Sequence, residues 1–211
     1  MRLYLSSENF GKHKELLVQL TKGNIKVAYI GNAGDYSSAE ERASKVEEYR
    51  QQFEELGFEF TEIDLREYFT IKPEGNIFEG YGLVWCSGGN TFLLRSALKQ
   101  SGQDDVLVRM IKNDDIAYGG SSAGSVIAGP TLRGTEHGDR PEDVHDVYDS
   151  EVITEGLGLV PFVCIPHWGT DWFGDSALKM RDYLKSEQIP YQLLEDGQVM
   201  LLDGETQELL A

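Results

Sequence analysis

The stretch Ile116–Ala128, IAYGGSSAGSVIA, decides the fold, because it passes from a short apolar strand through a glycine-rich turn into a helix. In that turn only Ser122 has a glycine two positions before it and two after it, Gly120 and Gly124. Strand, sharp turn and helix are the context of a G-x-S-x-G nucleophile elbow, whose glycines leave space that Cβ atoms would fill. The stretch predicts a nucleophilic Ser122 at the carboxyl end of a strand. The alternative is a tight turn in which Ser122 only caps the helix.

The rest of the chain alternates short apolar segments with longer amphipathic ones, which is the pattern of β-α units on a largely parallel sheet. Helices are expected at 12–20, 39–56, 91–99, 104–111, 122–128 and 175–187. Strands are expected at 2–6, 24–30, 58–64, 81–86, 116–119, 162–166, 191–194 and 199–202. The last two should form a terminal hairpin around residues 195–197. This pattern predicts the α/β class.

Two segments have distinctive ends or composition. The helix at 39–56 should begin with a capping box, formed either by Ser37 with Glu40 or by Ser38 with Glu41. Residues 131–158 are rich in Asp, Glu and Gly with little periodicity, and they are too long for an ordinary connection. We therefore expect this segment to be either functional or mobile.

Length and composition fit one soluble globular domain, residues 1–211, with 40% hydrophobic and 10% aromatic residues. The chain has 36 Asp and Glu against 19 Lys and Arg, hence a net charge of −17, which argues against nucleic acid and anionic membranes as partners. The N-terminus lacks signal-peptide features and no apolar run is long enough to span a membrane, so a cytoplasmic location is expected. Cys86 and Cys164 lie in apolar segments and are predicted to be buried free thiols.

A second glycine-rich turn follows the strand at 81–86 and reads Cys86–Leu94, CSGGNTFLL. Paired glycines allow backbone N–H groups to point into a site, as an oxyanion hole requires. We nominate Gly88 and Gly89 as donors, with the N–H of Ala123 as the second arm. The alternatives are an anion-binding turn or a strand exit in which Asn90 caps the next helix.

The third motif is Cys164–Gly169, CIPHWG, in which His167 leaves the end of a late strand. Of the four histidines, His13 opens an exposed helix, whereas His137 and His145 lie in the acidic segment. His167 is therefore the candidate general base, able to take the proton of Ser122 and return it to a leaving amine. Its alternative is a histidine that merely ends a strand.

A catalytic triad also needs a carboxylate that fixes the histidine tautomer. The segment 131–158 offers several, and Asp139 is the most constrained because Pro141 follows Arg140. The other acidic residues fit a solvated charge run. No nucleotide fingerprint is present, and His137 and His145 lack partners at zinc spacing, so neither a cofactor nor a metal is predicted.

Three ordered motifs carry a family resemblance: SGGNTFLL at 87–94, the Y-x-G-x-S-A-G elbow with PTLR at 130–133 after it, and the later Pro166-His167. Together they resemble the dipeptidase E and cyanophycinase family of serine peptidases. The resemblance implies a three-layer α/β fold with a mostly parallel central sheet, similar to class I glutamine amidotransferases and flavodoxin-like. Those amidotransferases use Cys at the elbow, where this chain has Ser122.

Carried onto this sequence, the resemblance assigns the nucleophile to Ser122, the base to His167, and the oxyanion donors to Gly88 or Gly89 and Ala123. The acid falls on Asp139 if two residues are inserted here. Without that insertion the matching position is Glu136, which remains the second candidate.

The function implied is hydrolysis of short peptides, with Asp-X dipeptides as expected substrates and Asn90 and Arg133 as expected substrate contacts. A charge of −17 disfavours an acidic substrate unless a local basic group overrides it, and Arg133 is the candidate. The alternative is a non-hydrolytic binding module on the same fold. The sequence does not indicate an oligomeric state.

Overall fold

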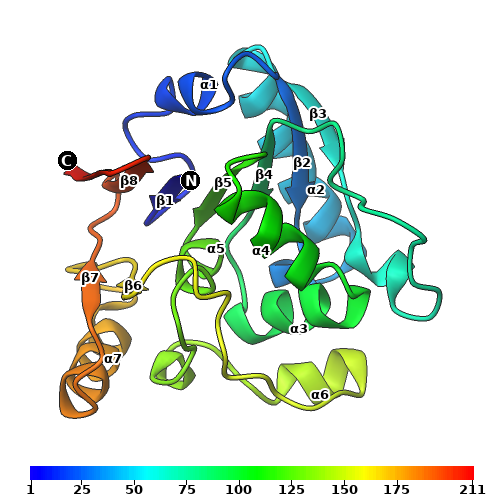
Figure 1. The fold of residues 1–211 in the computed structure, drawn as a ribbon. Helices are drawn as coiled ribbons and strands as arrows, with labels where there is room; N and C mark the ends of the chain where they lie inside the picture. Colours follow the sequence, from blue (N-terminus) through cyan, green and yellow to red (C-terminus); the bar gives the residue numbers. More distant parts are fainter.

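Seven strands form the central sheet of the computed structural model, which describes residues 1–211 (Figure 1). Their spatial order is β3 (Glu59–Glu62), β2 (Lys26–Ile30), β4 (Leu83–Cys86), β5 (Ala117–Ser121), β1 (Arg2–Ser6), β8 (Val199–Asp203) and β9 (Thr206–Leu210). The first five are parallel, and β8 and β9 continue the sheet in antiparallel fashion. The prediction of a mostly parallel sheet is confirmed.

Alternate residues of the central strands enter two separate cores, one on each face of the sheet. On β1, Leu3 and Leu5 belong to the larger core, whereas Tyr4 belongs to the smaller one. On β4, Val84 joins the larger core and Trp85 the smaller one. Successive side chains of a strand point to opposite faces, so apolar runs at these positions require helices on both sides.

Those helices complete a layer on each face. The smaller core takes residues of α1 (Leu16–Leu20) and α2 (Ala39–Glu55). The larger core takes residues of α3 (Thr91–Ser101), α4 (Asp104–Lys112), α5 (Ala123–Val126) and α7 (Gly174–Ser186). Ser38 caps α2 in a full capping box with Glu41, which decides between the two pairs that the sequence allowed.

The turn between β5 and α5 confirms the close packing expected around the elbow. A Cβ atom at Gly124 would lie 2.0 Å from the carbonyl oxygen of Cys86 on the neighbouring strand β4. Only glycine fits there, because real Cβ atoms do not approach an oxygen so closely. The glycine therefore lets α5 start directly against the end of β4.

The predicted hairpin of residues 191–194 and 199–202 is wrong. β7 (Tyr191–Leu193) pairs in parallel with β6 (Val163–Ile165) in a separate two-stranded sheet, whereas β8 pairs with β1 and β9. The antiparallel hairpin is β8 with β9, a strand that the sequence analysis missed. As a result, residues 194–198 cross from the small sheet to the large one instead of forming a hairpin turn.

The acidic segment 131–158 contains regular structure that its composition did not indicate. It holds the short 3-10 helix η3 (Thr135–His137), the helix α6 (Asp143–Tyr148) and a β-bridge between Thr131 and Glu155. Two further 3-10 helices are η1 (Asn32–Gly34) and η2 (Leu65–Tyr68). The first predicted helix is also shorter than expected, since only Leu16–Leu20 is helical.

Both cysteines are buried and unpaired, as the sequence predicted, and burial raises the pKa of Cys86 and of Cys164 to about 12. Neither thiol therefore acts as a nucleophile at neutral pH. None of the helices combines the length and the apolar character needed to cross a membrane.

Candidate active site

Ser122 sits on the turn between β5 and α5 with a left-handed backbone, at φ 49° and ψ −110°. A residue with a Cβ rarely adopts a positive φ, so this conformation stores strain that the surrounding packing must hold. The Ser122 N–H donates to the carbonyl of Ser6, which anchors the turn to β1. Ser122 therefore lies on a strained turn at the carboxyl end of β5, as the elbow motif predicted.

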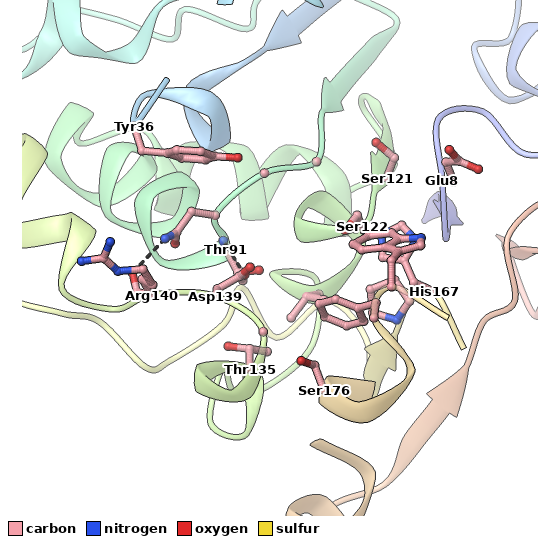
Figure 2. Close-up of a pocket in the computed structure, with 18 of the residues that line it drawn as sticks. Glu8, Tyr36, Thr91, Ser121, Ser122, Thr135, Asp139, Arg140, His167 and Ser176 are labelled. Carbon is pink, nitrogen blue, oxygen red and sulfur yellow. Dashed lines mark hydrogen bonds between the residues drawn. The ribbon is translucent and has the colours of Figure 1, made fainter. Parts of the chain in front are cut away.

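His167 follows β6 and also has a positive φ, 57°. Its Nε2 lies 3.0 Å from the Oγ of Ser122, within hydrogen-bond distance. The His167 side chain is 8% exposed, and the rings of Trp172 and Phe173 pack beside the imidazole with centroids at 4.5 and 5.5 Å. The structure therefore brings together the serine and the histidine that the sequence singled out (Figure 2).

The carboxylate that contacts His167 is Asp196, which the sequence analysis did not nominate. Its Oδ1 lies 2.8 Å from the Nδ1 of His167. Because an ionised carboxylate only accepts hydrogen bonds, Nδ1 carries the proton in this pair and Nε2 is free to accept one from Ser122. Asp196 lies in the crossing segment 194–198, which explains why a predicted hairpin turn concealed it.

The two nominated acids do not contact the histidine. Asp139 lines the same cavity, but its Oδ2 accepts the backbone N–H of Thr91 at 2.9 Å. Glu136 is exposed, and its Oε2 accepts the N–H of Gly134 within its own turn. Both acids therefore lie in the segment that the sequence indicated, without reaching Nδ1 of His167.

Two of the nominated oxyanion donors, Gly88 and Gly89, line the same cavity as Ser122, and the third, Ala123, follows Ser122 directly in sequence. Gly88 is so close that a Cβ atom built on it would lie 3.1 Å from the Cβ of Ser122. Gly89 has a φ of +146° and approaches the Ala33 carbonyl closely, so it must be glycine. The N–H groups of Gly88, Gly89 and Ala123 make no backbone hydrogen bond within the protein. They are therefore available to an oxygen of a bound ligand.

Ser122 and His167 open into a cavity of about 910 Å³, large enough for a short peptide. The oxyanion turn and α2 form one side of it, and α7 with the segment after η3 forms the other (Figure 2). Two aromatic side chains stand at its mouth, Trp172 at 69% exposure and Tyr36 at 56%. The cavity is thus open to solvent next to the serine.

The two residues predicted to contact the substrate, Asn90 and Arg133, lie in different places relative to the cavity. Asn90 lines the cavity, but its amide is already used: Oδ1 accepts the N–H groups of Phe92 and Leu93, and Nδ2 donates to the Arg140 carbonyl and to Asp143. Arg133 is exposed and does not line the cavity. The prediction that Arg133 supplies a basic contact for the substrate therefore stays untested, and its side chain is not part of the cavity wall.

Ser7 is a further residue of the site that the sequence analysis missed. Its Oγ accepts the backbone N–H of His167 at 2.7 Å and lies 2.8 Å from Oδ1 of Asp196 and 3.2 Å from the Leu194 carbonyl. The side chain is fully buried at the end of β1. Only its place at the carboxyl end of a central strand could have signalled it, because one serine among many carries no pattern.

Comparison with known proteins agrees with this geometry. The sequence profile of peptidase family S51 matches residues 3–210, which is nearly the whole chain. The chain belongs to peptidase family S51. It is therefore a serine peptidase, and the family resemblance expected from the three motifs is confirmed.

Relatives in the family are distant, and the share of each chain that the match covers differs between them. An uncharacterised peptidase of Pasteurella multocida is 27% identical over 205 residues, 97% of this chain and 95% of its own length. Peptidase E of Streptomyces coelicolor is 31% identical over 132 residues, which is 58% of this chain and 49% of that protein. These identities support the family and leave the substrate of this chain open.

Solved structures agree on the fold. A candidate peptidase E from Listeria monocytogenes EGD-e superposes with a TM-score of 0.72 at 24% identity and covers 99% of this chain and 97% of its own. A peptidase from an acI-B1 Actinobacterium gives a TM-score of 0.63 at 17% identity, with coverage of 99% and 93%. The predicted α/β class with a mostly parallel sheet flanked by helices is confirmed.

Proposed function

We propose that this S51 peptidase hydrolyses short peptides through a triad of Ser122, His167 and Asp196. The observation that carries the proposal is the continuous line of contacts from Asp196 to Nδ1 of His167, at 2.8 Å, and from Nε2 to Ser122 Oγ, at 3.0 Å. Nucleophile, base and orienting carboxylate in hydrogen-bond reach are the defining arrangement of covalent acyl transfer.

In this mechanism Ser122 Oγ attacks the carbonyl carbon of the scissile amide while Nε2 of His167 takes its proton. Asp196 holds the Nδ1 proton and stabilises the positive charge that forms on the ring. The oxygen of the tetrahedral intermediate lies among the N–H groups of Gly88, Gly89 and Ala123, whose unused donors support this role.

The second half of the reaction uses the same groups in reverse. His167 gives its proton to the leaving amine, and the C–N bond breaks to leave an acyl-enzyme on Ser122. Water then attacks the ester with His167 again as base, which releases the acid product and restores the serine. Trp172 and Phe173 exclude solvent from one side of the imidazole during these steps.

The proposed substrates are short peptides, and Asp-X dipeptides are the finer form of this proposal. An aspartyl side chain would need a cation at the cavity, and Arg133 is not among the residues that line it. The cations that line the cavity are Lys45 and Arg140, both exposed at its rim. If Lys45 or Arg140 forms an ion pair with the substrate side chain, Asp-Leu should be cleaved faster than Ala-Leu.

Replacing the nucleophile tests the reaction itself. We expect Ser122→Ala to lower kcat on X-Leu dipeptides on the order of 10⁶-fold, because the triad acts as a unit. A panel of X-Leu dipeptides assayed with the wild type and this variant reports catalysis and specificity together. Unchanged turnover by Ser122→Ala in a clean preparation would refute the proposed nucleophile.

A serine-directed fluorophosphonate separates a peptidase from a binding module on the same fold. An activated serine forms a covalent adduct, so mass spectrometry should find the label on Ser122 in the wild type. A wild-type protein that resists labelling at high reagent concentration, and that binds peptides without cleaving them, would support the binding module instead.

A further inference from the structure

The cavity wall that surrounds His167 is built from uncharged side chains. Its members are Pro166, Trp172, Phe173, Ser176 and Met180. Apart from His167, the ionisable acids and bases that line the cavity come from other segments, as Glu8, Lys45, Glu48, Asp139, Arg140 and Asp143. Figure 2 shows Ser176 and His167 across the cavity from Tyr36. In a chain with a net charge of −17, the side of the cavity next to the base is thus free of formal charge.

Trp172 is the member of this uncharged wall that exposes most of its surface. It is 69% exposed, whereas Met180 is buried in the larger core. Phe173 is held from behind, because a Cβ atom built on Gly138 would lie 2.5 Å from its Cζ. A tryptophan side chain has a large apolar surface and normally buries most of it. An indole left exposed inside a cavity therefore has apolar surface that a ligand can cover.

The position of Trp172 is fixed relative to the general base. Its ring centroid lies 4.5 Å from that of His167 and 5.3 Å from that of Phe173. The segment between His167 and Trp172 is a turn, in which the N–H and the hydroxyl of Thr170 both donate to the His167 carbonyl. Gly169 takes a φ of +80° in this turn. The indole is therefore placed by the same turn that leads away from the base.

The reaction determines which part of a substrate lies beside His167. The leaving nitrogen receives its proton from Nε2, so these two atoms come within about 3 Å of each other. The Cα of the leaving residue is about 1.5 Å from that nitrogen. Its side chain therefore begins within about 5 Å of Nε2. Since the indole packs against the same imidazole, this side chain is within reach of Trp172.

We propose that Trp172 forms the subsite for the residue on the leaving side of the scissile bond, and that this subsite selects apolar side chains such as Leu and Phe. The proposal rests on the proposed reaction at Ser122. An apolar leaving residue covers the exposed indole, so that both surfaces are removed from water. A charged leaving residue meets no opposite charge on the uncharged wall. Leu and Phe should therefore be favoured over Gly, Ala, Asp and Lys at this position.

The test varies the two sides of the scissile bond separately. The first series is X-Gly, X-Ala, X-Leu and X-Phe, where X is the acyl residue that the wild type cleaves fastest in the X-Leu panel. All members of this series pass through one acyl-enzyme and differ only in the leaving residue. The X-Leu panel is the second series, since it varies the acyl residue alone. The p-nitrophenyl ester of X forms the same acyl-enzyme without a leaving residue.

Three variants accompany the wild type. Trp172→Ala removes the indole, and Trp172→Phe keeps an aromatic ring. The control is Leu178→Ala, which truncates a side chain of α7 that is 41% exposed and does not line the cavity. Leu178→Ala should match the wild type on every substrate.

For the wild type we expect kcat/KM on X-Leu to exceed that on X-Ala about 10-fold, at the lower end of what apolar pockets achieve because this one is open to solvent. In Trp172→Ala the ratio should fall to about 2, and Trp172→Phe should keep most of it. Loss of the shield over His167 lowers all rates by a common factor, which the p-nitrophenyl ester measures. The order of rates in the X-Leu panel should be the same in Trp172→Ala and in the wild type.

Three outcomes would overturn the inference while leaving the peptidase intact. Equal cleavage of X-Ala and X-Leu by the wild type would show that no apolar subsite exists on the leaving side. A wild-type ratio that persists in Trp172→Ala would assign the selection to other residues. A changed order in the X-Leu panel of Trp172→Ala, with the leaving-residue ratio intact, would place the indole on the acyl side.

Fluorophosphonate labelling keeps the two proposals distinguishable. It counts active sites in each variant, so a misfolded Trp172→Ala protein is recognised by its loss of labelling, and Trp172→Gln then provides the same test with a polar side chain. The wild-type comparison of X-Ala with X-Leu needs no variant. A wild type that neither labels nor hydrolyses any member of either series would refute the proposed function itself.

Discussion

Asp196 and His167 form the contact on which the proposed chemistry depends most at the scale of single residues. We expect Asp196→Asn to lower kcat on the order of 10⁴-fold, because an amide can donate to Nδ1 and so favour the wrong tautomer of His167. Steady-state kinetics on the best X-Leu dipeptide, together with the rate of fluorophosphonate labelling, measure the effect.

The neighbouring Glu195 provides the control for this prediction, since it is exposed and one residue away in the same crossing segment. Glu195→Gln should keep wild-type kcat. If Asp196→Asn retained full activity while Asp139→Asn or Glu136→Gln abolished it on all substrates, the triad would have to be reassigned to the acidic segment.

Ser7 is a positioning residue, because its hydroxyl contacts both His167 N–H and Asp196. We expect Ser7→Ala to lower kcat about 10-fold with little change in KM, since the hydrogen bonds that join the Ser7 hydroxyl to the His167 N–H and to the Asp196 carboxylate are lost. Ser7→Thr, which keeps a hydroxyl, should restore part of the activity. A change in KM without a change in kcat would show that Ser7 does not position His167 and Asp196 for catalysis.

Ser122 and His167 could be found from the sequence because each stands in a local motif at a strand end. Asp196 could not, because its role depends on where the chain goes after β7. Alternating residues around Glu195, Asp196 and Gly197 fit a hairpin turn as well as a crossing between two sheets. Local pattern does not determine which sheet a short strand joins.

Among the helices and strands too, some were predictable from local sequence pattern and others were not. Parallel strands and their helices were predictable, because strands buried on both faces read as continuous apolar runs. The helices η3 and α6 were not, since they are short and are held by tertiary contacts instead of their own periodicity. Asn90 illustrates this, because its amide caps α3 and also bonds to Asp143 of α6.

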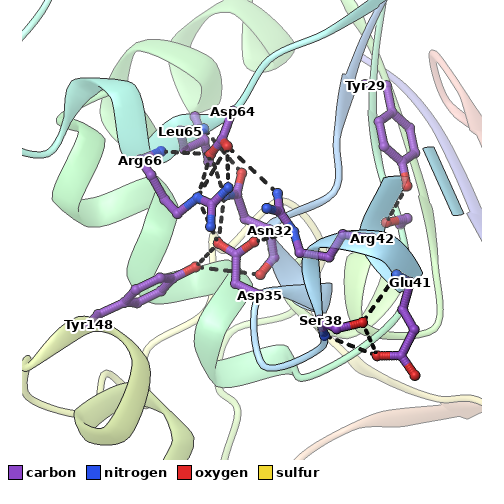
Figure 3. Close-up of polar contacts among 11 residues, drawn as sticks. Tyr29, Asn32, Asp35, Ser38, Glu41, Arg42, Asp64, Leu65, Arg66 and Tyr148 are labelled. Atoms are coloured by element: carbon purple, nitrogen blue, oxygen red, sulfur yellow. Dashed lines mark hydrogen bonds and ion pairs between the residues drawn. The ribbon is translucent and has the colours of Figure 1, made fainter. Parts of the chain in front are cut away.

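A polar cluster joins η1, α2, η2 and α6 (Figure 3). Asp35, after η1, lies 2.8 Å from Arg42 of α2 and accepts the hydroxyl of Tyr148 from α6. Asp64 accepts hydrogen bonds from Asn32 of η1 and from Arg66 of η2. The cluster therefore ties α6, whose Asp143 lines the cavity, to α2 and to the segments that follow β2 and β3.

Asp64 makes the stability of this cluster dependent on pH. Burial alone would raise the pKa of Asp64, but hydrogen bonds from Arg66 and Asn32 outweigh it and lower the pKa to about 2. A carboxylate with a lowered pKa in the folded state stabilises the fold above its unfolded value of about 4. That contribution is lost as the pH falls from about 4 to 2.

We therefore expect Asp64→Asn to lower the free energy of unfolding by about 1 kcal/mol at neutral pH. Its stability should also decline less steeply than that of the wild type between pH 4 and 2. Urea unfolding at a series of pH values measures both effects. Asp182→Asn, which removes an exposed ion pair with Arg181, should leave stability within about 0.5 kcal/mol of the wild type.

For the molecule as a whole, the net charge of −17 acts on every charged substrate that approaches. Long-range repulsion lowers the local concentration of anionic peptides and raises that of cationic ones, within a screening distance of about 8 Å at physiological salt. Recognition of an aspartyl side chain works against this field. Substrate charge is thus a test of the proposed preference for Asp-X dipeptides.

Varying the ionic strength distinguishes the long-range effect of the net charge on kcat/KM from the effect of local contacts with the substrate. For Asp-Leu, which carries a net charge of −1, we expect kcat/KM to rise about two- to fivefold between low and 0.2 M salt, because screening removes repulsion. Ala-Leu, a zwitterion, should change little, and Ala-Leu amide, with a net charge of +1, should show a fall. NaCl and KCl must give the same result, since a screening effect does not depend on the ion. If Asp-Leu is instead cleaved faster at low salt, attraction by Lys45 and Arg140 at the rim exceeds the repulsion by the net negative charge. That result would give a physical reason for a preference for aspartyl substrates.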